Sequence, residues 1–302
     1  MKIAYLIMAH NTPRHVQRLV SALSTSSAGF FIHVDRKSRL SDFSVTGDGV
    51  HFTKKRVAVF WGDFTQVEAI LALIEAALAD ERRFERFVLL SGADYPLRSA
   101  SEIESFFESH PKTEFINLVP MPSVAAGKPI SRLSTYWLRP ATPRPFRAVQ
   151  RLLMMARVLP RERDYRSCFG GLAPYAGSTW WALSRDACEY IADVANRETR
   201  LVRFHRHAHC PDESFFQTIL GNSDFKSRIA RNLTYTDWSA GGRSPATISD
   251  RHLPILRTQS SFPEEDVYGT GPMLFARKFT DERGDLVAEL DRHILERWRT
   301  GS

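Results

Sequence analysis

Two aspartates stand after apolar runs that predict buried β-strands. Asp35 follows residues 30–34, and Asp94 follows residues 87–90 with only Ser-Gly-Ala between. Open α/β sheets bind ligands at the carboxyl ends of their strands. The sequence therefore predicts that both carboxylates lie at a ligand site. For Asp94, a purely structural role in a turn is the alternative.

A third carboxylate, Glu213, has the setting of a general base. Pro211 and Asp212 start a predicted helix that buries an apolar side through residue 220. Glu213 would lie in its first turn, where the helix dipole favours the ionised form. Proton abstraction requires such a fixed, ionised carboxylate. The alternative is a capping-turn glutamate with no further role.

Two cations, Arg277 and Lys278, stand inside the apolar bracket Leu-Phe-Ala-Arg-Lys-Phe at residues 274–279. Apolar flanks hold such side chains in place, as anion recognition requires. The alternative is a pair of amphipathic side chains that reach for solvent.

The densest polar cluster is a run of histidines followed by Cys210, Asp212 and Glu213. The histidines are His205, His207 and His209. This spacing suggests a zinc site, and with it a metal hydrolase. Alternate residues share one face only on a strand, however, and arginines interrupt the run. A surface loop is therefore the favoured interpretation.

The elements that position these residues alternate between strand and helix. A strand over residues 2–9 precedes a helix that Thr12 would cap, with Pro13 in its first turn. A further strand is expected at 114–118 and another at 177–184. Helices are expected over 63–74, from Ser99 or Ser101 to 107, from Ser184 to 195, and over 285–298. This pattern predicts an α/β fold with a mostly parallel sheet, and the chain lacks the glycine-rich loops of dehydrogenases and P-loop enzymes.

Residues 122–167 differ from the rest, because prolines and arginines alternate there around a helical piece at 149–155. A solvated, mobile loop is the favoured interpretation of this basic insertion. The alternative is a lid or membrane-facing element beside a site.

The composition of the sequence indicates the kind of binding partner and the cellular compartment to expect. The 302 residues carry 41 Lys+Arg against 34 Asp+Glu, a net charge of +7. The excess of positive charge favours an anionic partner, either a phosphorylated small molecule or an anionic membrane surface. Nucleic acid is a further possible partner, although the sequence has no recognisable nucleic-acid-binding motif. A non-catalytic anion-binding module is thus one hypothesis. Three cysteines, no signal peptide and no apolar stretch of membrane-spanning length lead us to expect a cytoplasmic protein, peripheral on the inner face of a membrane at most.

Eight segments, in order, resemble the core-2/I-branching β-1,6-N-acetylglucosaminyltransferase and peptide O-xylosyltransferase family, glycosyltransferase family 14. They are AYLIMAH at 4–10, IHVD at 32–35, VFWGDFTQVE at 59–68, LSGADYP at 90–96, GSTWWALSR at 177–185, PDESFF at 211–216, TDW at 236–238 and LFARKF at 274–279. Together they are spread over most of the chain except the insertion. The chain lacks the anchor, stem and cysteine framework of animal members, so a bacterial member is expected.

The resemblance implies one GT-A-type nucleotide-diphospho-sugar transferase domain over 1–302, with 122–167 inserted. It implies inverting transfer from a UDP-sugar to a glycan or glycoconjugate hydroxyl, in polysaccharide biosynthesis for instance. N-acetylglucosamine is the expected sugar, and UDP-xylose with a peptide acceptor is the alternative. No metal or other cofactor is expected, and no nucleic acid.

The resemblance also implies roles for single residues. Glu213 matches the catalytic base and Lys278 the diphosphate-binding lysine, which Arg277 would assist. By the same analogy the nucleotide lies near His10 and Asp35, and the donor sugar near Asp94. The expected acceptor-stacking rings are Trp181 and Trp238, and the second diphosphate-binding cation is either Arg251 or Arg257.

Overall fold

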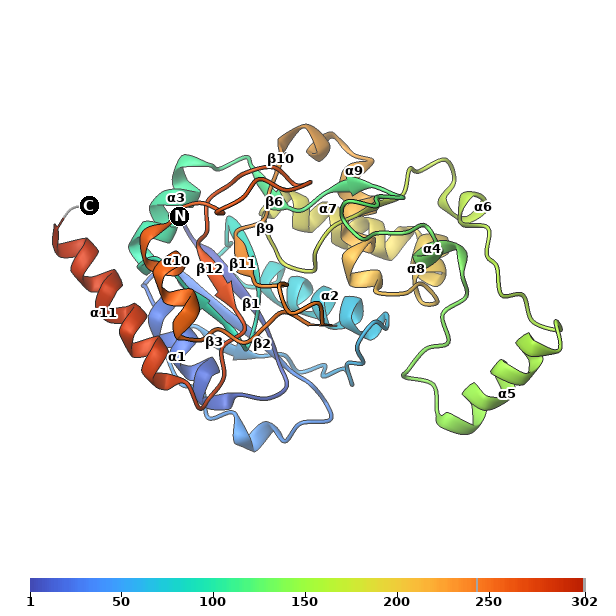
Figure 1. The fold of residues 1–302 in the computed structure, drawn as a ribbon, viewed down its shortest axis with the longest axis horizontal. Helices are drawn as coiled ribbons and strands as arrows, with labels where there is room; N and C mark the ends of the chain where they lie inside the picture. The colour runs from blue at the N-terminus through green and yellow to red at the C-terminus, as the bar shows by residue number, and fades with distance from the viewer. Residues whose placement is uncertain (243, 301–302) are drawn as a thin grey trace.

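The computed structural model describes residues 1–242 and 244–300, and a seven-stranded sheet forms its centre (Figure 1). The strand order is β10-β6-β9-β4-β1-β2-β3, and only β9 runs antiparallel to its neighbours. The bounds are β1 Ile3–Ala9, β2 Ala28–Val34, β3 Val50–Phe52, β4 Arg86–Ser91, β6 Glu114–Ile116, β9 Trp181–Ser184 and β10 Ile229–Ala230. The predicted α/β architecture with a mostly parallel sheet is confirmed.

Helices cover both faces of this sheet. Along β1, Ala4 and Leu6 join one core with α2 and α7, whereas Tyr5 and Ile7 join another with α1 and α3. This alternation is the period of two that a strand imposes. The bounds are α1 Pro13–Leu23, α2 Thr65–Leu78, α3 Ala100–Ser109, α4 Ser131–Ser134, α5 Arg144–Met155, α6 Tyr165–Phe169, α7 Arg185–Arg197, α8 Thr199–His205, α9 Phe215–Gly221, α10 Leu253–Thr258 and α11 Gly284–Thr300.

The predicted helix starts after Thr12, Ser99 and Ser184 are confirmed, but the predicted side-chain cap forms only at the two serines. Ser99 forms a capping box with Glu102, and the Ser184 side chain accepts a hydrogen bond from Ala187 N. Thr12, in contrast, has a left-handed backbone (φ 57°) and caps nothing. Its hydroxyl instead donates to Gly92 O at 3.1 Å, which joins the ends of β1 and β4.

A smaller sheet of order β11-β12-β5 lies beside the main one, with bounds Thr234–Thr236, Phe275–Arg277 and Asp94–Pro96. Its register places Arg277 between Thr236 and Asp94. Helices α10 and α11 share its own apolar core. Short strands β7 Val119–Pro120 and β8 Tyr175–Ala176 pair beside the ends of the insertion.

The predicted strand at 177–184 forms only from Trp181 onward, as β9. Residues 177–180 run along a cavity instead. The described residues also form the short 3-10 helices η1 Leu40–Asp42, η2 Pro211–Glu213, η3 Asp224–Arg228 and η4 Asp250–His252. No helix in the described part of the chain has the length and apolar character needed to cross a membrane.

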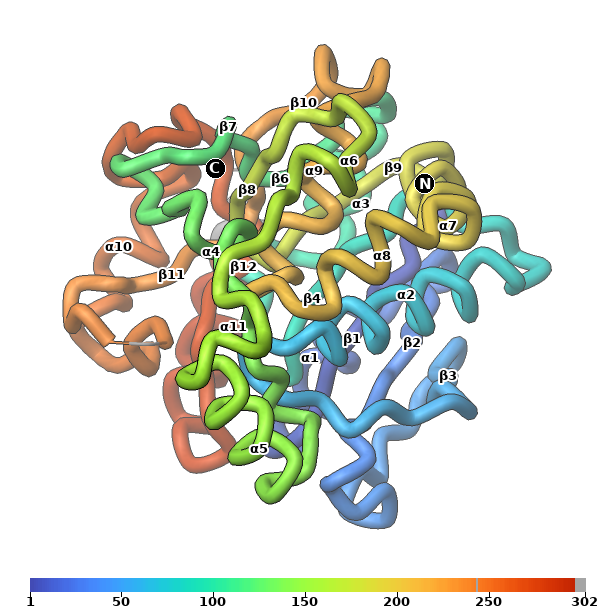
Figure 2. Tube along the Cα trace, turned by 90° about the vertical axis from the view of Figure 1, so that its right-hand side faces the viewer, coloured from blue at the N-terminus to red at the C-terminus, as the bar shows by residue number. Residues whose placement is uncertain are grey.

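The insertion leaves the body as an arm (Figures 1 and 2). Its neck is a pair of antiparallel segments, in which Tyr136 N donates to Arg161 O and Arg163 N to Ser134 O, both at 2.8 Å. The predicted helical piece lies within α5, none of whose residues is buried. The arm therefore holds α5 away from the cores of the molecule.

Candidate active site

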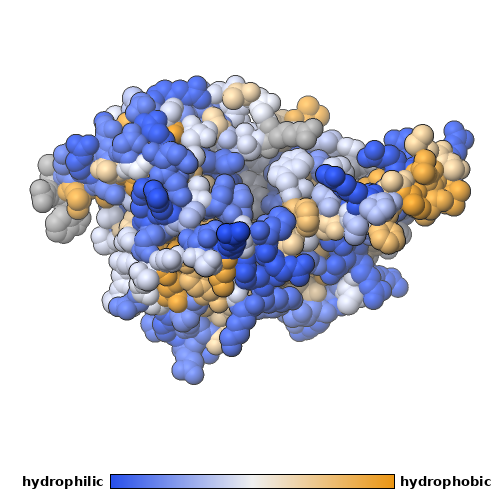
Figure 3. Space-filling view, turned by 90° about the horizontal axis from the view of Figure 1, so that it is seen from below, coloured by the Kyte–Doolittle hydropathy of each residue, from blue (hydrophilic) through white to orange (hydrophobic). Residues whose placement is uncertain are grey.

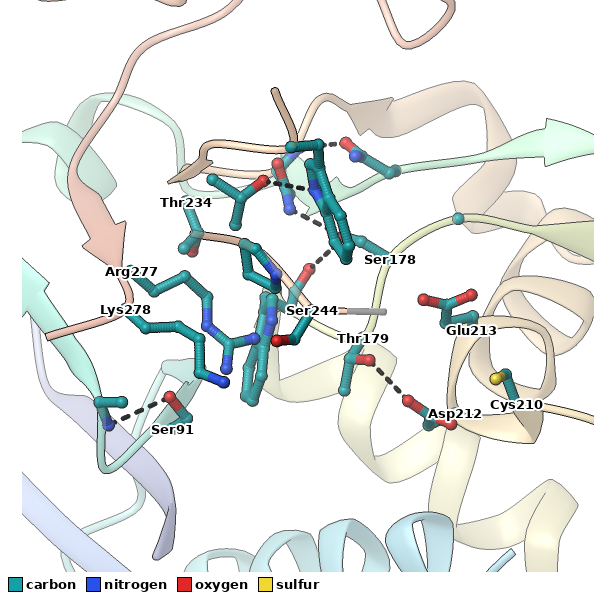
Figure 4. A pocket seen from close by; sticks show the side chains of 18 of the residues that line it. Ser91, Ser178, Thr179, Cys210, Asp212, Glu213, Thr234, Ser244, Arg277 and Lys278 are labelled. Carbon is teal, nitrogen blue, oxygen red and sulfur yellow. Dashed lines mark hydrogen bonds between the residues drawn. The ribbon is translucent and has the colours of Figure 1, made fainter. Parts of the chain in front are cut away.

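One cavity of about 1390 Å³ opens at the carboxyl ends of β1 and β4 and between the two sheets. Glu213 and Lys278 both line it, Glu213 at the end of η2 and Lys278 directly after β12 (Figure 4). Thr179 and Ser178 lie between them in the view. The structure thus brings the predicted base and the predicted diphosphate-binding cation to one cavity.

Arg277 is fixed from two sides. Its Nε lies 3.2 Å from Asp94 Oδ1, and its guanidinium lies 4.1 Å from the centre of the Trp180 ring. Asp94 is fully buried and also accepts a hydrogen bond from Ser91 N at 3.0 Å. Burial raises the pKa of Asp94, and Arg277 opposes the shift. This clamp holds the guanidinium at the cavity wall.

Asp94 itself does not line the cavity, so the predicted contact with a donor sugar is wrong. Its carboxylate faces Ser91 and Arg277 because β5 pairs with β12 in that register. The geometry supports the alternative, a structural role for Asp94 in the turn after β4. The Asp94 carboxylate also positions Arg277.

The side chain of Lys278 also points into the cavity (Figure 4). Among the described residues, Asp94 pairs with Arg277, and no carboxylate forms an ion pair with Lys278. Burial and the neighbouring Arg277 lower the pKa of Lys278. A half-buried ammonium group without a partner is suited to receive an anionic ligand.

Glu213 is held ionised, but not by the predicted helix dipole. It ends η2, a separate 3-10 turn, and α9 begins only at Phe215. Burial opposes its ionisation, but Lys128 and Arg132 outweigh burial and lower the pKa of Glu213. Lys128 Nζ donates to Oε2 at 2.6 Å, and Arg132 donates to the same oxygen. No described residue hydrogen-bonds Oε1, which is therefore available to a ligand.

Both cations come from the insertion and were not predicted as site residues. A small hairpin closed by Ser123 and Lys128 delivers the lysine, and Arg132 follows in α4. His209 N donates to Arg132 O at 3.0 Å and ties α4 to the segment before η2. The first part of the insertion is thus a wall of the cavity, so the mobile-loop interpretation is wrong there.

Replacement of Lys128 by Met is expected to move the acid limb of the pH profile. Without this ammonium, one of the two cations that oppose the effect of burial is lost, so the pKa of Glu213 rises. Because the base acts ionised, the acid limb of kcat/KM shifts to higher pH. The control is Lys112→Met on the exposed surface. A limb that stays in place in Lys128→Met would show that Lys128 does not tune the base.

Asp212, next to the base, is fully buried and strained electrostatically. Thr179 Oγ1 donates to its Oδ2 at 2.6 Å and Gln66 at 3.3 Å, while Oδ1 has no partner among the described residues. Burial, with the charge of Glu213, raises the pKa of Asp212 to about 6. Asp212 therefore opposes folding once it ionises.

We expect Asp212→Asn to stabilise the protein at neutral pH but not at pH 4. A carboxyl whose pKa is higher when folded loses stability as pH rises from the unfolded value, 3.8, to about 6. The two-unit difference corresponds to at most about 3 kcal/mol. Urea unfolding at pH 4 and pH 7.5 measures the difference, and Asp224→Asn on the surface is the control. An equal loss of stability at both pH values would contradict this account of Asp212.

His10 and Asp35 both line the cavity, at the ends of β1 and β2. Asp35 pairs with Lys37 Nζ at 2.9 Å, and Lys37 lines the cavity as well. The structure therefore brings these residues to one wall, and nucleotide contact by them stays a prediction.

Of the two predicted stacking rings, only Trp238 is accessible. Trp238 is 54% exposed at the cavity, whereas Trp181 is 2% exposed and packs against Phe216 in the core. The assignment of Trp181 to a sugar is therefore wrong, because β9 begins at Trp181 and commits it to the sheet. Its neighbour Trp180 lines the cavity instead.

Neither Arg251 nor Arg257 lines the cavity. Arg251 pairs with Asp237 at 2.6 Å, and Arg257 pairs with Glu289 in α11. Both are thus paired outside the cavity lining, and the assignment of either as the second diphosphate-binding cation stays a prediction. Arg231 does line the cavity, although Asp266 holds it at 2.6 Å.

The histidine run packs on aromatic rings rather than converging on a metal. His205 stacks on Phe169. His207 packs at a tilt against Tyr136, with ring centres 4.4 Å apart, and His209 against Trp137, with ring centres 4.1 Å apart. Within residues 1–242 and 244–300, no three His, Cys, Asp or Glu side chains are arranged to hold a metal ion. The histidines instead anchor the neck of the arm, so the hydrolase hypothesis has no structural basis in them.

Comparison with known proteins identifies the family of the chain. The family model described as Core-2/I-Branching enzyme matches residues 3–259, and the chain belongs to that family. Xylosyltransferase 1 of Rattus norvegicus is 24% identical over 318 residues, covering 100% of this chain and 36% of the relative. Xylosyltransferase 2 of Canis lupus familiaris is 25% identical over 318 residues, which cover 100% of this chain and 35% of that relative. The chain thus spans about a third of the length of these relatives.

Among solved structures, mouse xyloside xylosyltransferase 1 in its apo form matches 91% of this chain and 97% of its own. Its TM-score is 0.38 and its sequence identity 10%. A second match, a glucose-1-phosphate thymidylyltransferase of Bacillus anthracis, has a TM-score of 0.30 and a sequence identity of 12%.

Proposed function

We propose that the chain is an inverting glycosyltransferase that moves a sugar from a UDP-sugar to an acceptor hydroxyl without a metal ion. The observation that carries the proposal is the shared cavity: an ionised carboxylate, Glu213, and an unpaired ammonium, Lys278, both line it. Family membership supports the same reaction class.

Each charge has a place in the reaction. The acceptor O–H gives its proton to Glu213 Oε1 as the acceptor oxygen forms a bond to the anomeric carbon. The bond from that carbon to the phosphate oxygen breaks, and UDP leaves with the electron pair. Lys278 and the clamped Arg277 stabilise the charge that develops on the diphosphate. Attack opposite the leaving group inverts the anomeric centre.

The donor sugar is the finer part of the proposal. The sequence resemblance favours N-acetylglucosamine, whereas the relatives that match over the whole chain are named xylosyltransferases. UDP-xylose and UDP-N-acetylglucosamine are therefore the two donors to compare first.

A thermal-shift and UDP-release screen in excess EDTA tests the proposal. UDP and one of the UDP-sugars are expected to raise the melting temperature, as any ligand of the folded state does. Donor hydrolysis or transfer should then release UDP at an unchanged rate with EDTA. Stabilisation by DNA or RNA but not by UDP would favour the anion-binding module instead. Loss of release in EDTA alone would overturn only the metal-independent part.

A further inference from the structure

Helix α5 exposes an apolar stripe that nothing in the described structure covers. Phe146 is 64% exposed, Val149 53% and Leu152 63%. At 3.6 residues per turn these three fall on one side of the helix, together with the half-buried Leu153. Met155 and Val158 add exposed apolar surface at its end. Figure 3 shows this surface gathered at the projecting end of the molecule.

The opposite side of α5 is cationic. Arg144, Arg147 and Arg151 lie there, and Arg157 follows the helix. None of the four forms an ion pair with a carboxylate of the described residues, and the sequence has no acidic residue from 115 to 161. The helix therefore combines an unpartnered apolar face with uncompensated positive charge.

We propose that α5 is a peripheral anchor that lies in the surface of an anionic lipid bilayer. Such a helix buries its apolar side at the level of the headgroups while its arginines reach the lipid phosphates. Charge complementarity selects this partner over a second copy of the chain, whose α5 carries the same positive charge.

The arm that carries α5 is anchored at the cavity. Trp137 N donates to His207 O at 2.9 Å, and Arg139 pairs with the buried Asp63 at 3.0 Å. Arg132, a few residues earlier, holds Glu213. A membrane-bound α5 thus keeps the opening of the cavity at a fixed distance from the lipid surface.

Vesicle flotation with the full chain tests the anchor without using catalysis. Wild type is expected to bind vesicles of phosphatidylcholine with phosphatidylglycerol, to bind pure phosphatidylcholine far less, and to be released by salt. Phe146→Ser with Leu152→Ser should lower the partition coefficient at least tenfold. The matched control, Leu40→Ser with Leu295→Ser, removes two exposed leucines elsewhere and should bind as wild type.

The electrostatic part has its own pair of variants. Arg147→Gln with Arg151→Gln should weaken binding to the anionic vesicles by roughly 5-fold per arginine. Arg14→Gln with Arg292→Gln, two exposed arginines away from α5, should leave it unchanged. The proposal is overturned if wild type does not float with anionic vesicles. It is also overturned if a control double variant weakens vesicle binding as much as the α5 double variant that it matches. A dimer detected by light scattering would overturn it as well, if only the α5 variants dissociate this dimer and added vesicles do not.

Discussion

Glu213→Gln is expected to lower kcat by about 10²–10⁴-fold while UDP binds as before. The amide keeps the size of the side chain but cannot accept the proton of the acceptor hydroxyl. UDP binding should persist because the diphosphate is assigned to Lys278, on the other side of the cavity. Single-turnover transfer and calorimetric UDP titration measure the two quantities separately.

The substitution also leaves Lys128 and Arg132 without their shared carboxylate. A melting curve therefore accompanies each assay, and Glu75→Gln on the exposed side of α2 serves as the matched control. Should the amide variant fail to fold, Glu213→Asp keeps the charge and retracts it. Transfer within threefold of wild type in a folded Glu213→Gln protein would remove Glu213 from the role of base.

Lys278→Met is expected to lower kcat about 10²–10³-fold and to weaken UDP binding at least tenfold. The methionine retains most of the apolar stem but withdraws the ammonium that faces the leaving diphosphate. Arg277 cannot replace it, because Asp94 and Trp180 fix its guanidinium. UDP calorimetry and initial rates in EDTA measure the effect.

Lys278→Arg separates charge from shape and should recover part of the rate. The control is Lys55→Met, an exposed lysine outside the cavity lining. Unaltered UDP affinity in Lys278→Met would mean that the diphosphate lies elsewhere, for which the Lys128 and Arg132 pair is the evident alternative.

The strands and their endings could be predicted because the signal is local. Apolar runs identify β1, β2 and β4, and the polar residues that follow them line the cavity as His10 and Asp35. That Glu213 and Lys278 share one site was predicted from the resemblance of eight ordered motifs to a family. The number of residues between Glu213 and Lys278 gives no information about their distance in space.

The errors arise where distant parts of the chain decide. Pairing of β5 with β12 turned Asp94 away from the cavity and toward Arg277. The point at which β9 begins sent Trp181 into the core and left Trp180 at the site. Lys128 carried no local signal at all, because its function depends on a carboxylate 85 positions away.

The position of UDP in a crystal structure of the complex would show whether Lys278 binds the diphosphate while Glu213 stays free to act as the base. We expect phosphate oxygens within hydrogen-bonding distance of Lys278 Nζ, with Glu213 Oε1 open toward the side from which an acceptor enters. A diphosphate bound to Lys128 and Arg132, displacing them from Glu213, would contradict this expectation.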